Sequence, residues 1–80
     1  MRDIAKFANY YIGDVIWIRQ GEGEYKATIV SLRMHYNERD NTGYCEYIID
    51  RYYNSKKNVI KEEDIIRLAE AGFERQLLGK

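Results

Sequence analysis

The sequence has one cysteine, no proline, no excess of charge of either sign and no long apolar run. Cys45 has no partner for a disulfide within the chain, so we expect a reducing, cytoplasmic location. A membrane-spanning helix needs about 18 or more consecutive apolar residues, and no segment approaches that length. The first residues, "MRDIAKFANYY", also lack the apolar stretch of a signal peptide. These absences predict a soluble intracellular protein without a membrane anchor.

The charges are balanced, with 13 basic and 13 acidic side chains. Proteins that bind nucleic acid usually present a basic surface, because phosphate neutralisation supplies most of their non-specific affinity. The balance therefore disfavours a nucleic-acid partner, although a local basic patch is compatible with it. No repeat or low-complexity run divides the chain, and we expect a single domain over residues 1–80.

Patterns for catalysis or metal binding are also missing. His35 has no second ligand at metal spacing, and nothing in the sequence orients it as a base for the Cys45 thiol. Glu62, Glu63 and Asp64 are adjacent acidic residues of the kind that favour the start of a helix. We therefore predict a protein that is not an enzyme and that needs no metal or cofactor.

Alternating apolar residues predict a mainly β protein. The stretch "YIGDVIWIR", residues 11–19, is rich in β-branched and aromatic residues, and "QGEGE" after it has the glycines of a hairpin turn. In the next strand the apolar phase flips near Ile29 and Val30, which indicates a bulge or a sharp bend. A long bent strand shared by two small sheets is typical of a five-stranded SH3-like barrel, and we expect such a barrel over residues 11–66.

The remaining segments complete this expected fold. The stretch "YCEYIIDRYY" predicts a third strand over residues 44–53, and a short fourth strand is expected around Val59 and Ile60. Apolar residues at helical intervals predict a C-terminal helix over about 64–78, docked by its apolar face. The same face would also allow a homo-oligomer. Residues 2–9 predict a short helical turn at the N-terminus.

Four stretches, taken in order, resemble a Tudor-like domain of the SH3-like barrel superfamily, with its Agenet and chromo-barrel relatives. They are "GDVIWI", "GEGEYKATIVSL", "YIIDRYYN" and "VIKEEDIIRL", and the resemblance spans roughly residues 13–68. Tudor-like domains typically bind peptides, and many hold a methylated lysine or arginine in a cage of aromatic rings through cation–π attraction. By this resemblance Tyr25 matches the tyrosine before the small residue of the second strand. Tyr52 and Asn54 match the aromatic residue and the asparagine of the loop after the third strand.

Tyrosines are abundant, with eight in the chain. A barrel of this size cannot bury all of them with every hydroxyl group satisfied, so several are expected at the surface. We therefore predict a binding module that recognises a protein or peptide through a tyrosine-rich groove at one barrel end, with a methylated side chain as one candidate ligand. Trp17 is a candidate for the edge of this groove, whereas its apolar neighbours in the strand favour core packing. The predicted ligand-binding residues are Tyr25, Tyr52, Tyr53, Asn54 and Trp17.

Two other functions are compatible with the sequence. A short chain without proline and without a recognisable second domain also suits a phage or mobile-element protein that binds and inhibits a host enzyme. Nucleic-acid binding through residues 51–61 is the other alternative, because neighbouring tyrosines can stack on bases. The basic residues of that alternative are Arg51, Lys56, Lys57 and Lys61.

Overall fold

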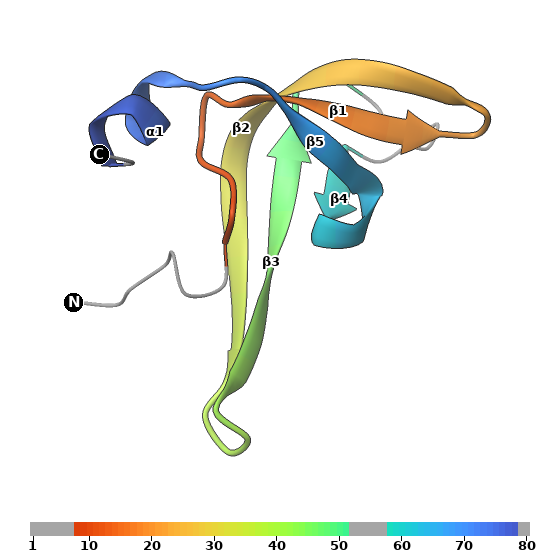
Figure 1. The fold of residues 1–80 in the computed structure, drawn as a ribbon. Helices are drawn as coiled ribbons and strands as arrows, with labels where there is room; N and C mark the ends of the chain where they lie inside the picture. The colour runs from red at the N-terminus through yellow and green to blue at the C-terminus, as the bar shows by residue number, and fades with distance from the viewer. Residues whose placement is uncertain (1–7, 52–57, 79–80) are drawn as a thin grey trace.

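The computed structural model of the chain describes residues 8–51 and 58–78 (Figure 1). Within them, five antiparallel strands form one sheet in the order β4-β3-β2-β1-β5, accompanied by one turn of 3-10 helix and one short α-helix. The predicted mainly β fold is therefore confirmed. No helix in this part of the chain has the length and apolar character needed to cross a membrane. The strands are β1 (Val15–Gln20), β2 (Gly23–Asn37), β3 (Thr42–Ile49), β4 (Val59–Lys61) and β5 (Ile65–Glu70).

Strand β2 is long and bent, and it pairs with a different neighbour on each side of the bend. Its first half pairs with β1 as far as Thr28, and its second half pairs with β3. The register with β3 shifts between Ile29 and Ser31, which confirms the break predicted from the change of apolar phase. Beyond the shift, β2 and β3 run on as a hairpin that projects from the rest of the sheet (Figure 1).

The sheet is open, and this corrects the expected closed barrel. Strand β4 pairs with β3 at three positions only, whereas β5 pairs with β1 at the other end of the strand order. Among the described residues no backbone ladder joins β4 to β5. Between them lies a turn of 3-10 helix, η2 (Glu62–Asp64), in which the Asp64 carboxylate accepts a hydrogen bond of 3.0 Å from the Lys61 N–H. The turn leads the chain away from β3 before a longer ladder can form.

Residues 65–70 form strand β5, although the sequence predicted the beginning of a helix there. Ile65 and Ile66 are β-branched and fit an extended backbone better than a helical one. The edge of β1 supplies the partner, with Ile16 opposite Leu68 in the register. Cross-strand pairing therefore overrides the helical spacing of the apolar residues in this segment.

The C-terminal helix, α1 (Phe73–Leu78), is consequently much shorter than predicted. Phe73 and Leu77 lie one helical turn apart, and their exposed fractions are 72% and 60%. The expectation of a helix docked by its apolar face is wrong for these two residues. Self-association through them stays a prediction. The helical turn predicted for residues 2–9 lies almost entirely outside the described residues.

The core lies on the concave side of the curled sheet. Ile16 and Ile18 of β1 share this side, whereas Trp17 between them points to the other face and is only half-buried. Core packing of Trp17, which its apolar neighbours in the sequence favoured, is therefore wrong. The buried apolar residues are Ala8, Ile16, Ile18, Ala27, Ile29, Cys45, Tyr47, Ile49 and Ile60.

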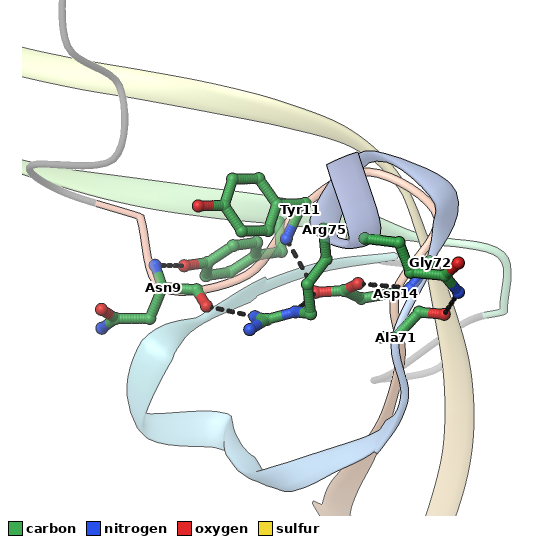
Figure 2. A network of polar contacts seen from close by, with 8 residues as sticks. Asn9, Tyr11, Asp14, Ala71, Gly72 and Arg75 are labelled. Atoms are coloured by element: carbon green, nitrogen blue, oxygen red, sulfur yellow. Dashed lines mark hydrogen bonds and ion pairs between the residues drawn. The ribbon is translucent and has the colours of Figure 1, made fainter. Parts of the chain in front are cut away.

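A buried aspartate connects α1 to the segment that precedes β1 (Figure 2). Asp14 has no exposed surface. One carboxylate oxygen accepts the Gly72 N–H at 2.8 Å, and the other accepts the Tyr11 N–H at 3.0 Å and Arg75 Nε at 2.8 Å. Arg75 Nη2 also donates to the Asn9 carbonyl at 2.6 Å. Because Phe73 and Leu77 of α1 are exposed, these polar contacts hold the helix in place. We call Asp14 and its three partners the Asp14 cluster.

Gly72 is a point of very close backbone approach within this region. A Cβ atom at this position would lie 2.4 Å from the carbonyl carbon of Gly13 and 2.7 Å from the backbone nitrogen of Asp14. Both neighbouring atoms belong to the backbone and cannot move as a side chain would. Any residue larger than glycine would therefore push α1 away from the Asp14 carboxylate.

Candidate binding site

Tyr25 lies on β2 close to the turn that joins it to β1, and its exposed fraction is 42%. It stands opposite Ile18 in the register and on the same face as Ala27, so it belongs to the rim of the concave side. The guanidinium of Arg51 stacks on its ring, with Cζ 4.8 Å from the ring centroid. Arg51 Nη1 also donates to the Lys26 carbonyl at 3.3 Å. The first predicted binding residue is therefore at the surface, and its ring already faces a cation.

Two reciprocal hydrogen bonds place Arg51 beside Tyr25. The Asp50 N–H donates to the Thr28 carbonyl at 3.1 Å, and the Thr28 N–H donates to the Asp50 carboxylate at 3.0 Å. These bonds bend the chain directly after Ile49. Strand β3 therefore occupies Thr42–Ile49, so it begins two residues before the strand predicted over residues 44–53 and ends before that strand does. Arg51 leaves the sheet at this bend and crosses toward β2.

The segment after Arg51 carries most of the predicted site. Its far end is fixed by Asn58, whose carbonyl accepts the Ile49 N–H at 2.8 Å and whose side-chain amide donates to the Ile49 carbonyl at 3.3 Å. An open cavity of about 320 Å³ lies between the two ends, lined by Val30, Ile49, Asp50, Arg51 and Asn58. The predicted binding residues Tyr52, Tyr53 and Asn54 lie outside the described residues.

Trp17 lies on the opposite face from Tyr25. The register pairs Trp17 with Lys26 and Ile18 with Tyr25, and consecutive strand residues point to opposite faces. Lys26 Nζ is 5.4 Å from the Trp17 ring and Arg67 Cζ is 5.3 Å from it, one from each neighbouring strand. The structure therefore does not bring Trp17 to the groove that was expected beside Tyr25.

The basic residues of the nucleic-acid alternative are distributed between different contacts. Arg51 stacks on Tyr25, whereas Lys61 lies on β4 with its Nζ 5.4 Å from the ring of Tyr44. Lys56 and Lys57 lie outside the described residues. The two described members thus belong to separate aromatic contacts, and nucleic-acid binding through residues 51–61 stays a prediction.

Sequence reasoning missed a second polar cluster, on the outward face of the β2–β3 hairpin. His35 and Tyr44 face each other across the ladder with stacked rings, 4.6 Å between centroids and 13° between planes. His35 Nε2 lies 2.8 Å from a Glu46 carboxylate oxygen, and Arg33 Nη1 lies 3.6 Å from the same oxygen. Alternation of polar residues along both strands is a signal that could have revealed this cluster. Its members are Arg33, His35, Tyr44, Glu46 and Lys61, and we call it the hairpin face.

Glu46 is the acidic residue of the hairpin face. Its hydrogen bond with His35 holds the pKa of the carboxyl below its usual value, and the charges of Arg33 and Lys61 act in the same direction. A carboxyl group with a lowered pKa in the folded state stabilises the fold above its unfolded pKa of about 4.3, and this contribution disappears as the pH falls through the folded pKa.

Substitution of Glu46 by glutamine is therefore expected to make the free energy of unfolding less dependent on pH in this acidic range. Urea unfolding of the protein and of the Glu46→Gln variant at pH 7 and near pH 3.5 would measure the difference. Glu22→Gln, an exposed residue of the turn between β1 and β2, is the control. Equal loss of stability upon acidification in the Glu46→Gln variant and in the unchanged protein would contradict the prediction.

Two buried groups have raised pKa values. Burial, followed by a hydrogen bond of 2.7 Å from its hydroxyl group to Glu62, raises the pKa of Tyr47 far above its ordinary value. Burial also raises the pKa of the Cys45 thiol, assisted by the Glu62 and Glu46 carboxylates. A buried thiol with a raised pKa has little thiolate and is a poor nucleophile. These groups therefore serve packing and hydrogen bonding.

Comparison with protein-family models, with curated proteins and with solved structures gives no significant match. Within residues 8–51 and 58–78, no group of three or more His, Cys, Asp and Glu side chains is arranged to hold a metal ion.

Proposed function

We propose that this protein is a non-enzymatic binding module and that it recognises a protein or peptide partner at the rim formed by Tyr25, Arg51 and the segment after Arg51. The observation that carries the proposal is the stack of a guanidinium on the exposed Tyr25 ring, at 4.8 Å. It supports the view that this ring face accepts cations in this protein. A cationic side chain of a partner, methylated or not, is the ligand that such a face attracts.

The surroundings of Tyr25 support a site of peptide size. The cavity of about 320 Å³ opens beside Arg51, and both ends of the segment between Arg51 and Asn58 are tied to the sheet. Binding residues carried on a segment anchored by a rigid sheet are common in recognition domains. We propose that Tyr52, Tyr53 and Asn54 complete the site from this segment.

We also propose that the open sheet is a variant of the Tudor-like SH3 barrel that the sequence resembles. The support is the long bent β2, shared between β1 and β3 with its register shift after Ile29. The same β2 carries Tyr25 close to the turn from β1, where the resemblance expects a ligand-binding tyrosine. Five antiparallel strands in one curled sheet agree with this relationship.

Titration with peptides that contain trimethyllysine or dimethylarginine tests the proposed function. NMR amide signals of Tyr25 and Arg51, which belong to the rim, and of Thr28, which bonds to the bend that carries Arg51, are expected to shift at millimolar peptide. The Tyr25→Leu variant is expected to bind at least about threefold more weakly, as an exposed cation–π contact is lost.

Tyr36→Leu is the matched control, because Tyr36 is also partly exposed but lies on the projecting hairpin. It should bind as the unchanged protein does. Unmoved rim amides with every peptide, or equal weakening by both substitutions, would refute the assignment of the site to Tyr25.

A further inference from the structure

We infer that the Arg51 guanidinium occupies the face of the Tyr25 ring in the free protein. A cationic side chain of the partner then binds to this ring face by displacing Arg51. The inference rests on the proposed function of Tyr25 and adds a means of regulating that site. In the free protein the ring face is covered by a residue of the same chain, so the site is competent only in the fraction of molecules in which Arg51 has moved away.

The position of the Tyr25 ring is set independently of Arg51. The ring folds back over Gly23, where a Cβ atom would lie 2.9 Å from the Tyr25 hydroxyl oxygen and 3.0 Å from two ring carbons. Gly23 therefore makes room for the ring close to the backbone. Removal of Arg51 should expose the ring face without changing where the ring lies.

Arg51 itself is held by contacts that a ligand can replace. Its guanidinium makes the stack on Tyr25 and one hydrogen bond of 3.3 Å to the Lys26 carbonyl, and the residue is exposed. Its backbone, in contrast, follows the fixed bend at Asp50 and Thr28. The side chain can thus swing away while its attachment stays beside the site, which keeps its local concentration high.

Competition of this kind lowers the apparent affinity by the fraction of molecules that are competent. An exposed cation–π contact of ordinary strength covers the ring in most molecules, and its removal should tighten binding by about three- to sixfold. To displace Arg51, the partner's cation must bind to the ring face more favourably than the Arg51 guanidinium does. A methylated cation, which is less strongly hydrated, or a peptide with additional contacts would do so.

The test measures binding of N-acetyl-trimethyllysine amide by NMR to the unchanged protein, to Arg51→Ala and to Arg19→Ala. Arg19 is an exposed arginine of β1, and its removal changes the net charge by the same amount. We expect about three- to sixfold tighter binding for Arg51→Ala only. In the free protein, the Arg51 side-chain protons should also show an upfield ring-current shift that disappears in Tyr25→Leu.

The outcomes separate this inference from the proposed function. Two results would overturn the inference that Arg51 occupies the ring face and leave the proposed binding site standing. They are Arg51 side-chain protons without an upfield shift, and equal affinity of Arg51→Ala and the unchanged protein for the probe. Equal tightening by Arg51→Ala and Arg19→Ala would also overturn it, because overall charge would then explain the effect. Absence of binding to all three proteins would reject both the site and its occupant.

Discussion

Replacement of Asp14 by alanine is expected to lower the free energy of unfolding by about 3 kcal/mol. The carboxylate is fully buried and accepts three hydrogen bonds, of which the one from Arg75 is also an ion pair. Removal of one partner of a buried pair typically costs 3–5 kcal/mol, and the lower value applies here because Arg75 is partly exposed and can be hydrated. A chain of 80 residues has a total stability of about 4–12 kcal/mol.

Urea unfolding followed by the fluorescence of Trp17, the single tryptophan, would measure this loss. Asp40→Ala is the matched control, because Asp40 is an exposed aspartate in the turn of the hairpin. Its substitution should change the stability by about 0.5 kcal/mol at most. A loss below about 1 kcal/mol for Asp14→Ala would show that the Asp14 cluster does not stabilise the fold as argued.

The second large effect is expected at the bend of β2. Ile29 is completely buried at the register shift, whereas the next residue, Val30, is 48% exposed. Ile29→Ala removes core contacts and leaves a cavity, which typically costs about 2–5 kcal/mol. Val30→Ala in the same bent backbone should cost less than about 1 kcal/mol, mostly through strand propensity.

The two substitutions differ by a single position in the chain, so their comparison tests the position of the bulge. If the bulge lay one residue away, the strand would present its other face to the core and Val30 would be the sensitive residue. Denaturation midpoints of both variants, measured with the same urea series, decide between the two. Similar losses for both residues would contradict the described register.

The strands were predictable because their signals are local. Alternation in residues 15–20 and the phase change at Ile29 and Val30 are determined by which face of each strand meets the core. The strand conformation of residues 65–70 was not predictable from local signals. Their apolar spacing is compatible with a helix, and only the unpaired edge of β1, which is remote in sequence, selects the strand. Closure of the sheet depends on the length of β4 and on the turn at η2, for which the sequence carries no clear signal.

The candidate site was predictable in part. An exposed Tyr25 followed from the number of tyrosines and from the resemblance, whereas its contact with Arg51 depends on the bend that Asp50 and Thr28 create. The alternation in this strand places Trp17 on the face opposite Ile16 and Ile18, as the structure has it. Apolar neighbours in sequence suggested burial, but in a strand they place the residue between them on the other side of the sheet.

The Asp14 cluster also has a consequence for the kinetics of folding. The contacts of Asp14 with Gly72 and Arg75 join residues separated by 58 and 61 positions, and the neighbouring bond from Arg75 to Asn9 spans 66 positions, nearly the whole described chain. Contacts of such long separation form only after the intervening chain has been ordered, since the entropy of closing that loop must be offset first. The cluster should therefore be absent from the folding transition state, so its loss would accelerate unfolding and leave the refolding rate almost unchanged. The contacts between α1 and the segment before β1 then determine how long each molecule stays folded.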